Sequence, residues 1–411
     1  MNIRPYNAHL DREAVHRIWR EVGWSDGTPA QEEATDLAFS GSRALVAELE
    51  GAPECAVLTM PATLRYLDED LPITVVKNVA TGHVGRKQGL AGRTVVHSLI
   101  RDVGEGALVA ALGMFEQGYY NRLGFGTGSY DRWVSFDPAT LHLPRGPRPP
   151  RRIADRDWPQ AHACRLQRRR GHGAVSIIPP EATGTEMLGA RNGVGLGYYD
   201  GPEGALSHYV WMGAANLANG PYFVRWLAYQ TNEQLLDLLA LLKALGDQVR
   251  LVGMIEPRGI QLQSMLLKPF KQRQLTEKGD YPAGVRGMAW WQMRICNLPG
   301  CLARTHLPGK AVRFNLRLSD PLTAHTGPHA HWRGVEGDYV VTLGPSSGAE
   351  KGADPALPTL SATVNAFTRL WLGVSPATGL AVTDGLQAGP ELLAQLDALL
   401  TIPQPLPDWA F

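Results

Sequence analysis

One stretch, residues 72–112, constrains the fold more than any other part of the sequence. Residues 72–81 (PITVVKNVAT) are rich in β-branched side chains, which favour a strand. Glycines at positions 82, 85 and 89 favour a turn, and residues 90–103 have the pattern of a helix. A short apolar run at residues 107–112 then predicts a buried strand. Strand, turn, helix and strand in this order predict an α/β layered fold.

The turn before the predicted helix has the composition of an anion-binding loop. It fits the pattern R/Q-x-x-G-x-G/A with six consecutive residues, Arg86, Lys87, Gln88, Gly89, Leu90 and Ala91. The first N–H groups of a helix lack partners and its dipole favours negative charge, so a diphosphate can bind there if no side chain blocks the main chain. Gly89 and Ala91 leave that approach open, and Arg86 and Lys87 add positive charge.

The same six-residue pattern also occurs where we expect no phosphate. Residues 168–173 (RRRGHG) match it, but they follow a helical pattern, which predicts a helix end with a glycine cap. A second strand, residues 221–230, is followed by TNEQ and a leucine-rich helix. That turn has no glycine and contains an acidic residue, so we predict no diphosphate there.

The order of predicted elements divides the chain into three domains. Residues 1–140 form the first domain, and residues 141–292 repeat its plan in weaker form. Residues 293–411 combine alternating strands with two helices, which predicts a smaller α+β domain. The proline- and arginine-rich residues 138–152 predict an extended linker, and residues 344–358 predict a loop.

Composition excludes several classes of protein. Forty basic and 39 acidic residues leave a net charge of +1, which gives no general attraction to nucleic acid or to an anionic membrane. No apolar run approaches the ~20 residues that span a bilayer, and the N-terminal residues lack the apolar core of a signal peptide. The four cysteines have no common zinc spacing. We therefore predict a cytoplasmic protein with reduced thiols.

Residues 114–131 (MFEQGYYNRLGFGTGSYD), after the predicted strand at 107–112, carry a second motif. Together with the turn at 86–91, they resemble the GNAT acetyltransferase superfamily, in which two strands splay apart beside such a turn. Residues 118–126 look like the signature of the helix after that splay. The tandem plan and the third domain narrow the likeness to the Eis-type (enhanced intracellular survival) enzymes, which have two GNAT domains and a sterol-carrier-like C-terminal domain.

The resemblance implies roles for particular residues. Tyr120 matches the general acid that protonates the departing CoA thiolate, a transfer that the ordinary pKa values of a phenol (~10) and a thiol (~8.5) allow. The main-chain amides of Val79, Ala80 and Thr81 match the strand that pairs with pantetheine and polarises the thioester. The carboxylate of Phe411 matches the family's C-terminal base, which burial would strengthen.

The resemblance also implies acetyl-CoA as co-substrate and a primary amine as acceptor, whether aminoglycoside-like, a polyamine or a lysine. Such an amine arrives as a cation, so we expect acidic and aromatic groups at its entrance. Trp24 and Asp26 lie on the loop where GNAT folds usually admit the acceptor. The family further suggests a hexamer.

Other functions are also compatible with the sequence. The protein could bind lipid or sterol through its third domain, or bind CoA without catalysis. His325, His329 and His331 form H-x3-H-x-H without a nearby acid or cysteine, so we predict no metal site. Residues 344–348 match the G-x-S-x-G hydrolase motif, but no helix follows them, so we predict no hydrolase.

Overall fold

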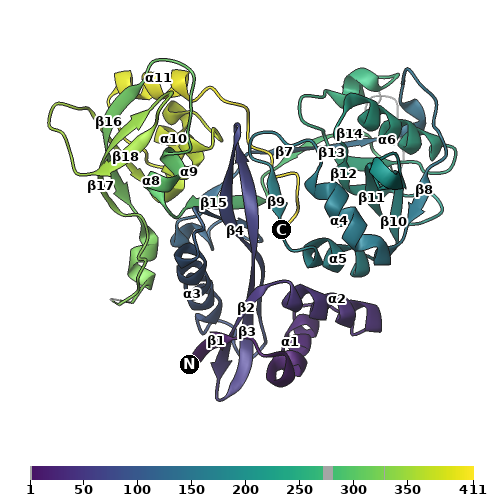
Figure 1. Cartoon of the computed structure of the whole chain (residues 1–411), viewed down its shortest axis with the longest axis horizontal. Helices are drawn as coiled ribbons and strands as arrows, with labels where there is room; N and C mark the ends of the chain where they lie inside the picture. Colours follow the sequence, from purple (N-terminus) through teal and green to yellow (C-terminus); the bar gives the residue numbers. More distant parts are fainter. Residues whose placement is uncertain (1, 272–280, 328) are drawn as a thin grey trace.

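The computed structural model describes residues 2–271, 281–327 and 329–411. Within these ranges the chain forms three β-sheets covered by helices, which confirms the predicted α/β fold class (Figure 1). The first sheet lies between the other two, with the second sheet on one side and the third on the other. Each sheet belongs to a separate layered unit.

The first sheet has the strand order β1-β2-β3-β4-β5-β15-β6, and β9 pairs with β3. Alternate residues of its strands face opposite sides. Val46 and Ala56 pack with the first two helices, whereas Ala47 and Val57 pack with the third. Its elements are β1 (Asn2–Pro5), α1 (Ala8–Glu21), α2 (Pro29–Ser40), β2 (Arg43–Leu49), β3 (Ala52–Tyr66), β4 (Glu69–Thr81), α3 (Leu90–Gly104), β5 (Val109–Gly113), β6 (Gly126–Thr127), β9 (Val175–Ile177) and β15 (Trp291–Ile295).

The second sheet has the order β14-β7-β13-β12-β11-β10-β8. Helix α6 packs on one face through its leucine stripe, and α4 packs on the other face near Tyr209 and Trp211. Its elements are β7 (Asp131–Phe136), β8 (Arg151–Ile153), α4 (Trp158–Leu166), α5 (Glu181–Leu188), β10 (Gly193–Tyr198), β11 (His208–Ala214), β12 (Tyr222–Ala228), α6 (Asn232–Ala244), β13 (Val252–Ile255) and β14 (Gly284–Met288).

The first two sheets exchange strands. Strand β7 comes before residue 140 in the sequence but pairs with β13 and β14 in the second sheet. Strand β15 follows the whole second unit and pairs with β5 in the first sheet. The two units are therefore joined by strand pairing as well as by the linker.

The third sheet has the order β18-β17-β16-β19. Strand β18 lies inside residues 344–358, so the prediction of a loop there was wrong: its main chain completes the sheet edge by pairing with β17. The elements of this unit are α8 (Leu298–Leu302), β16 (Val312–Ser319), β17 (Gly337–Leu343), β18 (Gly348–Lys351), β19 (Thr359–Thr363), α9 (Val364–Trp371), α10 (Ala377–Thr383) and α11 (Pro390–Leu399).

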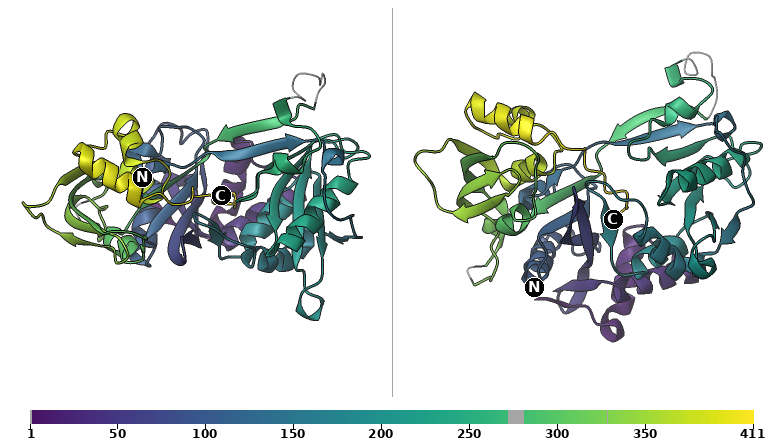
Figure 2. Two further views of the ribbon diagram at one scale, coloured as in Figure 1. Left: turned by 90° about the horizontal axis from the view of Figure 1, so that it is seen from above. Right: turned by 45° about the horizontal axis from the view of Figure 1, so that its top comes forward.

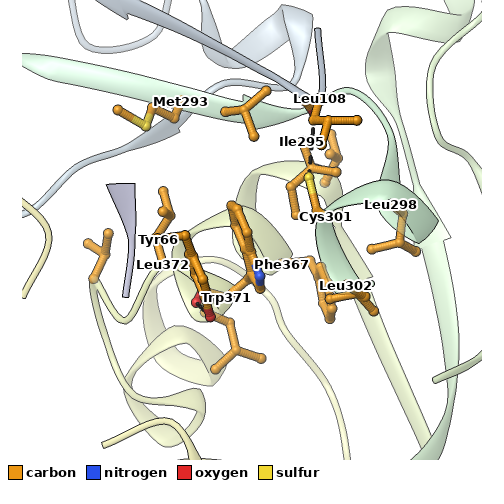
Figure 3. Close-up of a cluster of buried hydrophobic side chains, with 14 of the residues drawn as sticks. Tyr66, Leu108, Met293, Ile295, Leu298, Cys301, Leu302, Phe367, Trp371 and Leu372 are labelled. Carbon is orange, nitrogen blue, oxygen red and sulfur yellow. Dashed lines mark hydrogen bonds between the residues drawn. The ribbon is translucent and has the colours of Figure 1, made fainter. Parts of the chain in front are cut away.

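A continuous apolar core joins the third unit to the first sheet (Figure 3). Tyr66 of β3 stacks on Trp371 of α9 with ring centroids 4.4 Å apart, and its hydroxyl donates to the Trp371 carbonyl at 2.9 Å. Ile295 and Leu298 extend the same core along β15 and α8. The third unit is therefore held firmly against the edge of the first.

Residues 401–411 leave the third unit as a segment without helix or strand and run between the first two units (Figure 2). The Val175 N–H donates to the Pro407 carbonyl at 2.9 Å, and the Ser129 hydroxyl donates to the Pro405 carbonyl at 2.5 Å. Trp409 is fully buried. These contacts bring the last residues of the sequence to the first sheet.

Candidate active site

The first sheet opens between β4 and β5. The two strands pair in parallel from Ile73 opposite Val109 to Val76 opposite Leu112. Strand β4 then continues to Thr81, paired only with β3 on its other side. The structure thus places the three predicted main-chain groups, those of Val79, Ala80 and Thr81, along the open edge of β4.

A β-bulge marks the start of this opening. The pairing of β3 with β4 passes from Thr59 opposite Val76 to Leu58 opposite Asn78, so Lys77 is the extra residue. Its ammonium donates to Glu186 of α5 at 2.7 Å and to the Ala410 carbonyl at 3.4 Å. Sequence analysis missed Lys77, because a bulge is visible only in the pairing of two strands.

The predicted anion-binding turn lies directly after β4. Gly89 has a φ of +75° as the residue before α3, and no side chain caps this helix end. The Arg93 N–H donates to the Gly89 carbonyl, so the N–H groups of the three preceding residues have no partner within the helix. Residues 86–89 are exposed, Leu90 is buried and Ala91 is half-buried. The arrangement suits a diphosphate.

The two other places with related sequence differ from this turn. At the start of α6, Thr231 and Gln234 form a capping box, in which the Gln234 N–H donates to the Thr231 hydroxyl at 3.2 Å. That helix end is occupied by its own side chains. In residues 168–173, which follow α4, Arg168 is buried and pairs with Asp408 of the C-terminal segment.

Tyr120 lies in the apolar cluster under α3, together with Leu112 at the end of β5. The helix expected around residues 118–126 is instead a single 3-10 turn, Asn121–Leu123, because Gly124 reverses the chain with a φ of +83°. The Tyr120 side chain is 3% exposed, and burial raises its pKa well above the ordinary value for a phenol. It therefore carries its proton at neutral pH.

Phe411 lies at the same opening, on the other face of the sheet. Its main-chain oxygen lies against Gly113, and its ring is 5.2 Å from that of Trp290. Successive strand residues face opposite sides, so Gly113 faces away from the α3 side that Leu112 faces. Tyr120 and Phe411 thus approach the opening from opposite faces.

The predicted acceptor residues lie on the loop between α1 and α2. Trp24 is 47% exposed and packs edge-on against Trp19, with centroids 5.4 Å apart. The Asp26 carboxylate pairs with Arg191 of the second unit at 2.7 Å and accepts from the Thr28 N–H at 3.1 Å. Asp26 therefore forms an ion pair between the first and second units.

A cavity lies beside the C-terminal segment. This cavity, of about 730 Å³, is walled by β12, the chain after β13, residues 168–171, Trp290, Leu406 and residues 408–410. Residues 168–171, from the arginine-rich motif that follows α4, form part of its lining, and the other walls come from segments far apart in the chain. We refer to it below as the second-sheet cavity.

Among the residues that the structure describes, no cluster of three or more His, Cys, Asp or Glu side chains could hold a metal ion. His331 instead has its Nε2 atom 3.0 Å from the Ile100 carbonyl. In the same residues, no helix has the length and apolar character needed to cross a membrane.

Comparison of sequences finds no match: no protein-family model and no curated protein is similar to this chain. Comparison of structures finds the same fold in proteins described as GCN5-related N-acetyltransferases. A GCN5-related N-acetyltransferase from Anabaena variabilis has a TM-score of 0.77 and 15% identity over 100% of both chains. One from Kribbella flavida has a TM-score of 0.72 and 18% identity over 100% of this chain and 98% of that one.

The structure is also similar over its whole length to a protein of the kind that the sequence resembles. Eis1 from Mycobacterium abscessus has a TM-score of 0.74 and 17% identity over 100% of both chains. The predicted resemblance is thus confirmed at the level of the fold, and the sterol-carrier-like character of the third unit stays a prediction. At such identities the likeness concerns the fold alone. The evidence for an activity lies in the residues of the site.

Proposed function

We propose that this protein is an N-acetyltransferase that moves the acetyl group of acetyl-CoA directly to a primary amine. The observation that carries the proposal is the placement of Tyr120 and Phe411 on opposite faces of the opening between β4 and β5. An acid and a base on the two sides of one opening can act on a thioester and an amine that meet between them.

The first domain contributes the groups that hold acetyl-CoA. The main-chain N–H groups at the start of α3, with Arg86, Lys87 and Gln88 before them, bind its diphosphate. Gly89 and Ala91 let that group approach the main chain, and Leu90 anchors the turn in the core. The open edge of β4 at residues 79–81 pairs with the pantetheine arm and polarises the thioester carbonyl.

The chemical step uses one proton transfer on each face. The Phe411 carboxylate takes a proton from the ammonium group of the acceptor, whose nitrogen then attacks the thioester carbonyl carbon. A C–N bond forms and the C–S bond breaks. The nitrogen gives its second excess proton to water, and the Phe411 carboxyl group later gives the first one to water as well. Tyr120 gives its proton to the departing thiolate and is reprotonated from water. Its raised pKa keeps the proton available over the working range.

The measurement that tests this proposal is thiol release from acetyl-CoA with a panel of aminoglycosides, polyamines, a lysine peptide and arylalkylamines. Turnover with at least one amine is expected. A chain extended by one glycine after Phe411 should lose most of it, because the carboxylate moves away from Gly113. CoA binding without turnover of any amine would support a non-catalytic CoA-binding role, and binding of sterol alone would support a carrier.

The remaining expectations come from the resemblance of the sequence to the Eis-type enzymes. We propose that the third unit is sterol-carrier-like, that its main task is to deliver the C-terminal segment to the first sheet, and that the protein forms a cytoplasmic homohexamer. Light scattering on the purified protein measures the assembly directly, and a monomer would contradict that part of the proposal.

A further inference from the structure

The second-sheet cavity lies where the first sheet has its catalytic opening. Strands β12 and β13 pair in parallel only at Tyr222 opposite Val252 and Phe223 opposite Gly253, and then separate. The pairing of β11 with β12 shifts between Trp211 and Met212, so Arg225 is the extra residue on β12. Arg225 therefore occupies in the second sheet the bulge position that Lys77 occupies in the first.

The helix start beside this cavity is unsuited to a diphosphate, unlike the corresponding helix start in the first domain. The capping box of Thr231 and Gln234 fills the start of α6, and Glu233 adds negative charge in its first turn. At the start of α6, the diphosphate of a nucleotide would meet these side chains, whereas at the start of α3 it meets main-chain N–H groups. The cavity is suited to a smaller ligand.

Positive charge without a carboxylate partner lines this cavity. Among the described residues, Arg169, Arg225 and Arg258 form no ion pair there. Arg169 donates to the Asn232 side-chain oxygen at 2.8 Å, and Arg258 donates to main-chain carbonyls, including that of Gln404 at 2.8 Å. Arg225 is exposed at the bulge on the cavity wall. A ligand with an anionic group would supply the missing partner.

The acidic groups of the cavity are already engaged. Asp408 pairs with Arg168, and the Glu256 carboxylate accepts from the Leu262 N–H at 2.7 Å. The net charge of the lining is therefore positive. This differs from the acidic entrance that the sequence led us to expect for a cationic amine.

Flat apolar surfaces form the other walls. The Arg165 guanidinium lies between Trp226 and Trp409, at 4.0 and 3.7 Å from their ring centroids, and holds both rings in place. Trp290 lies on the cavity wall and also contacts the Phe411 ring. One wall of the cavity is thus shared with the residue proposed as the base.

We propose that the second-sheet cavity is the acceptor site, and that it takes an aromatic amine carrying a carboxylate. The carboxylate binds Arg225, the ring packs among the tryptophans, and the amine points along Trp290 toward Phe411. This inference rests on the proposed acetyl transfer. Under this proposal the second domain determines substrate specificity, because the charge of its cavity selects which amines reach the opening in the first domain.

Three compounds with one ring test the inference: 4-(aminomethyl)benzoate, benzylamine, which lacks the carboxylate, and 4-methylbenzoate, which lacks the amine. We expect the KM for 4-(aminomethyl)benzoate to be about tenfold below that for benzylamine, the effect of one charge-assisted contact. The Arg225→Met variant should raise the first KM about tenfold and leave kcat and the benzylamine KM unchanged. 4-Methylbenzoate should compete with the amine.

The control variant is Arg250→Met, an exposed arginine just before β13 in the same unit that does not line the cavity. It should change neither KM. Turnover of benzylamine and polyamines with no advantage from the carboxylate, and no effect of Arg225→Met, would overturn the acceptor site and leave acetyl transfer intact. Calorimetric binding of 4-methylbenzoate that depends on Arg225, without turnover of any amine, would overturn acetyl transfer and with it the acceptor role.

Discussion

The main-chain oxygen of Phe411 occupies the space that a side chain at Gly113 would need. Gly113 is the last residue of β5, so this contact fixes the end of the C-terminal segment to the strand that borders the opening. The Trp290 ring and the Lys77 ammonium hold the same segment from two further directions. The position of the proposed base is thus set by a glycine in the first domain.

The first prediction follows from this contact. A Gly113→Ala variant should lower kcat by about tenfold or more, because small displacements of a catalytic group are costly. The KM for acetyl-CoA should not change, since the turn before α3 is untouched. Gly146→Ala is the matched control, because a methyl group there meets no atom within 4 Å. Equal activity of the two variants would show that the terminal residue takes no part in the step.

The second prediction concerns the proposed acid. Tyr120→Phe keeps the ring that packs under α3 and removes only the proton donor, so kcat should fall by about 100-fold or more while CoA binding stays unchanged. Tyr119→Phe, beside it, should cost little. Because burial raises the pKa of Tyr120, wild-type kcat should not fall through loss of its proton up to pH ~10. An unchanged kcat in Tyr120→Phe would remove this residue from the mechanism.

The third prediction tests the anion-binding turn. Gly89→Val should raise the KM for acetyl-CoA more than tenfold, because the added side chain stands at the helix start and the φ of +75° disfavours it. The control Gly385→Val carries the same kind of strain, with a φ of +66° and open space around it. Thermal unfolding of both variants measures the strain. If acetyl-CoA affinity falls equally in both, the effect is global and the turn is not the binding site.

Local sequence predicted the segment from β4 to α3 well. Helix α3 begins at Leu90 as expected and ends within a residue of the predicted end, because its limits depend on a neighbouring glycine and on apolar spacing. Strand β4 ends at Thr81, also as expected. The predicted site residues from 79 to 91 form one continuous segment, and their proximity needed no tertiary information.

The features that sequence reasoning missed depend on contacts between distant segments. The exchange of β7 and β15 between sheets is decided by pairing across more than 100 residues. The bulges at Lys77 and Arg225 exist only relative to a partner strand. The second-sheet cavity combines β12, β13, the C-terminal segment and the arginines at 168–170. The arginine run was visible in the sequence, but the cavity it lines exists only once these distant segments meet.

A last prediction concerns Asp131, the buried first residue of β7, whose carboxylate accepts from the Trp290 indole N–H. Burial raises its pKa from 3.8 to about 6. The folded protein therefore binds this proton more tightly than the unfolded chain does, and the resulting stability is present below about pH 4 and lost as the pH rises through 6. In Asp131→Asn this dependence disappears. Relative to wild type, the variant should gain up to about 3 kcal/mol in its free energy of unfolding between pH 4 and pH 7.5, as measured by urea unfolding at both values. A difference that stays constant with pH would mean that Asp131 is ionised in the folded protein throughout, and that Trp290 is held by a charged carboxylate beside the proposed base.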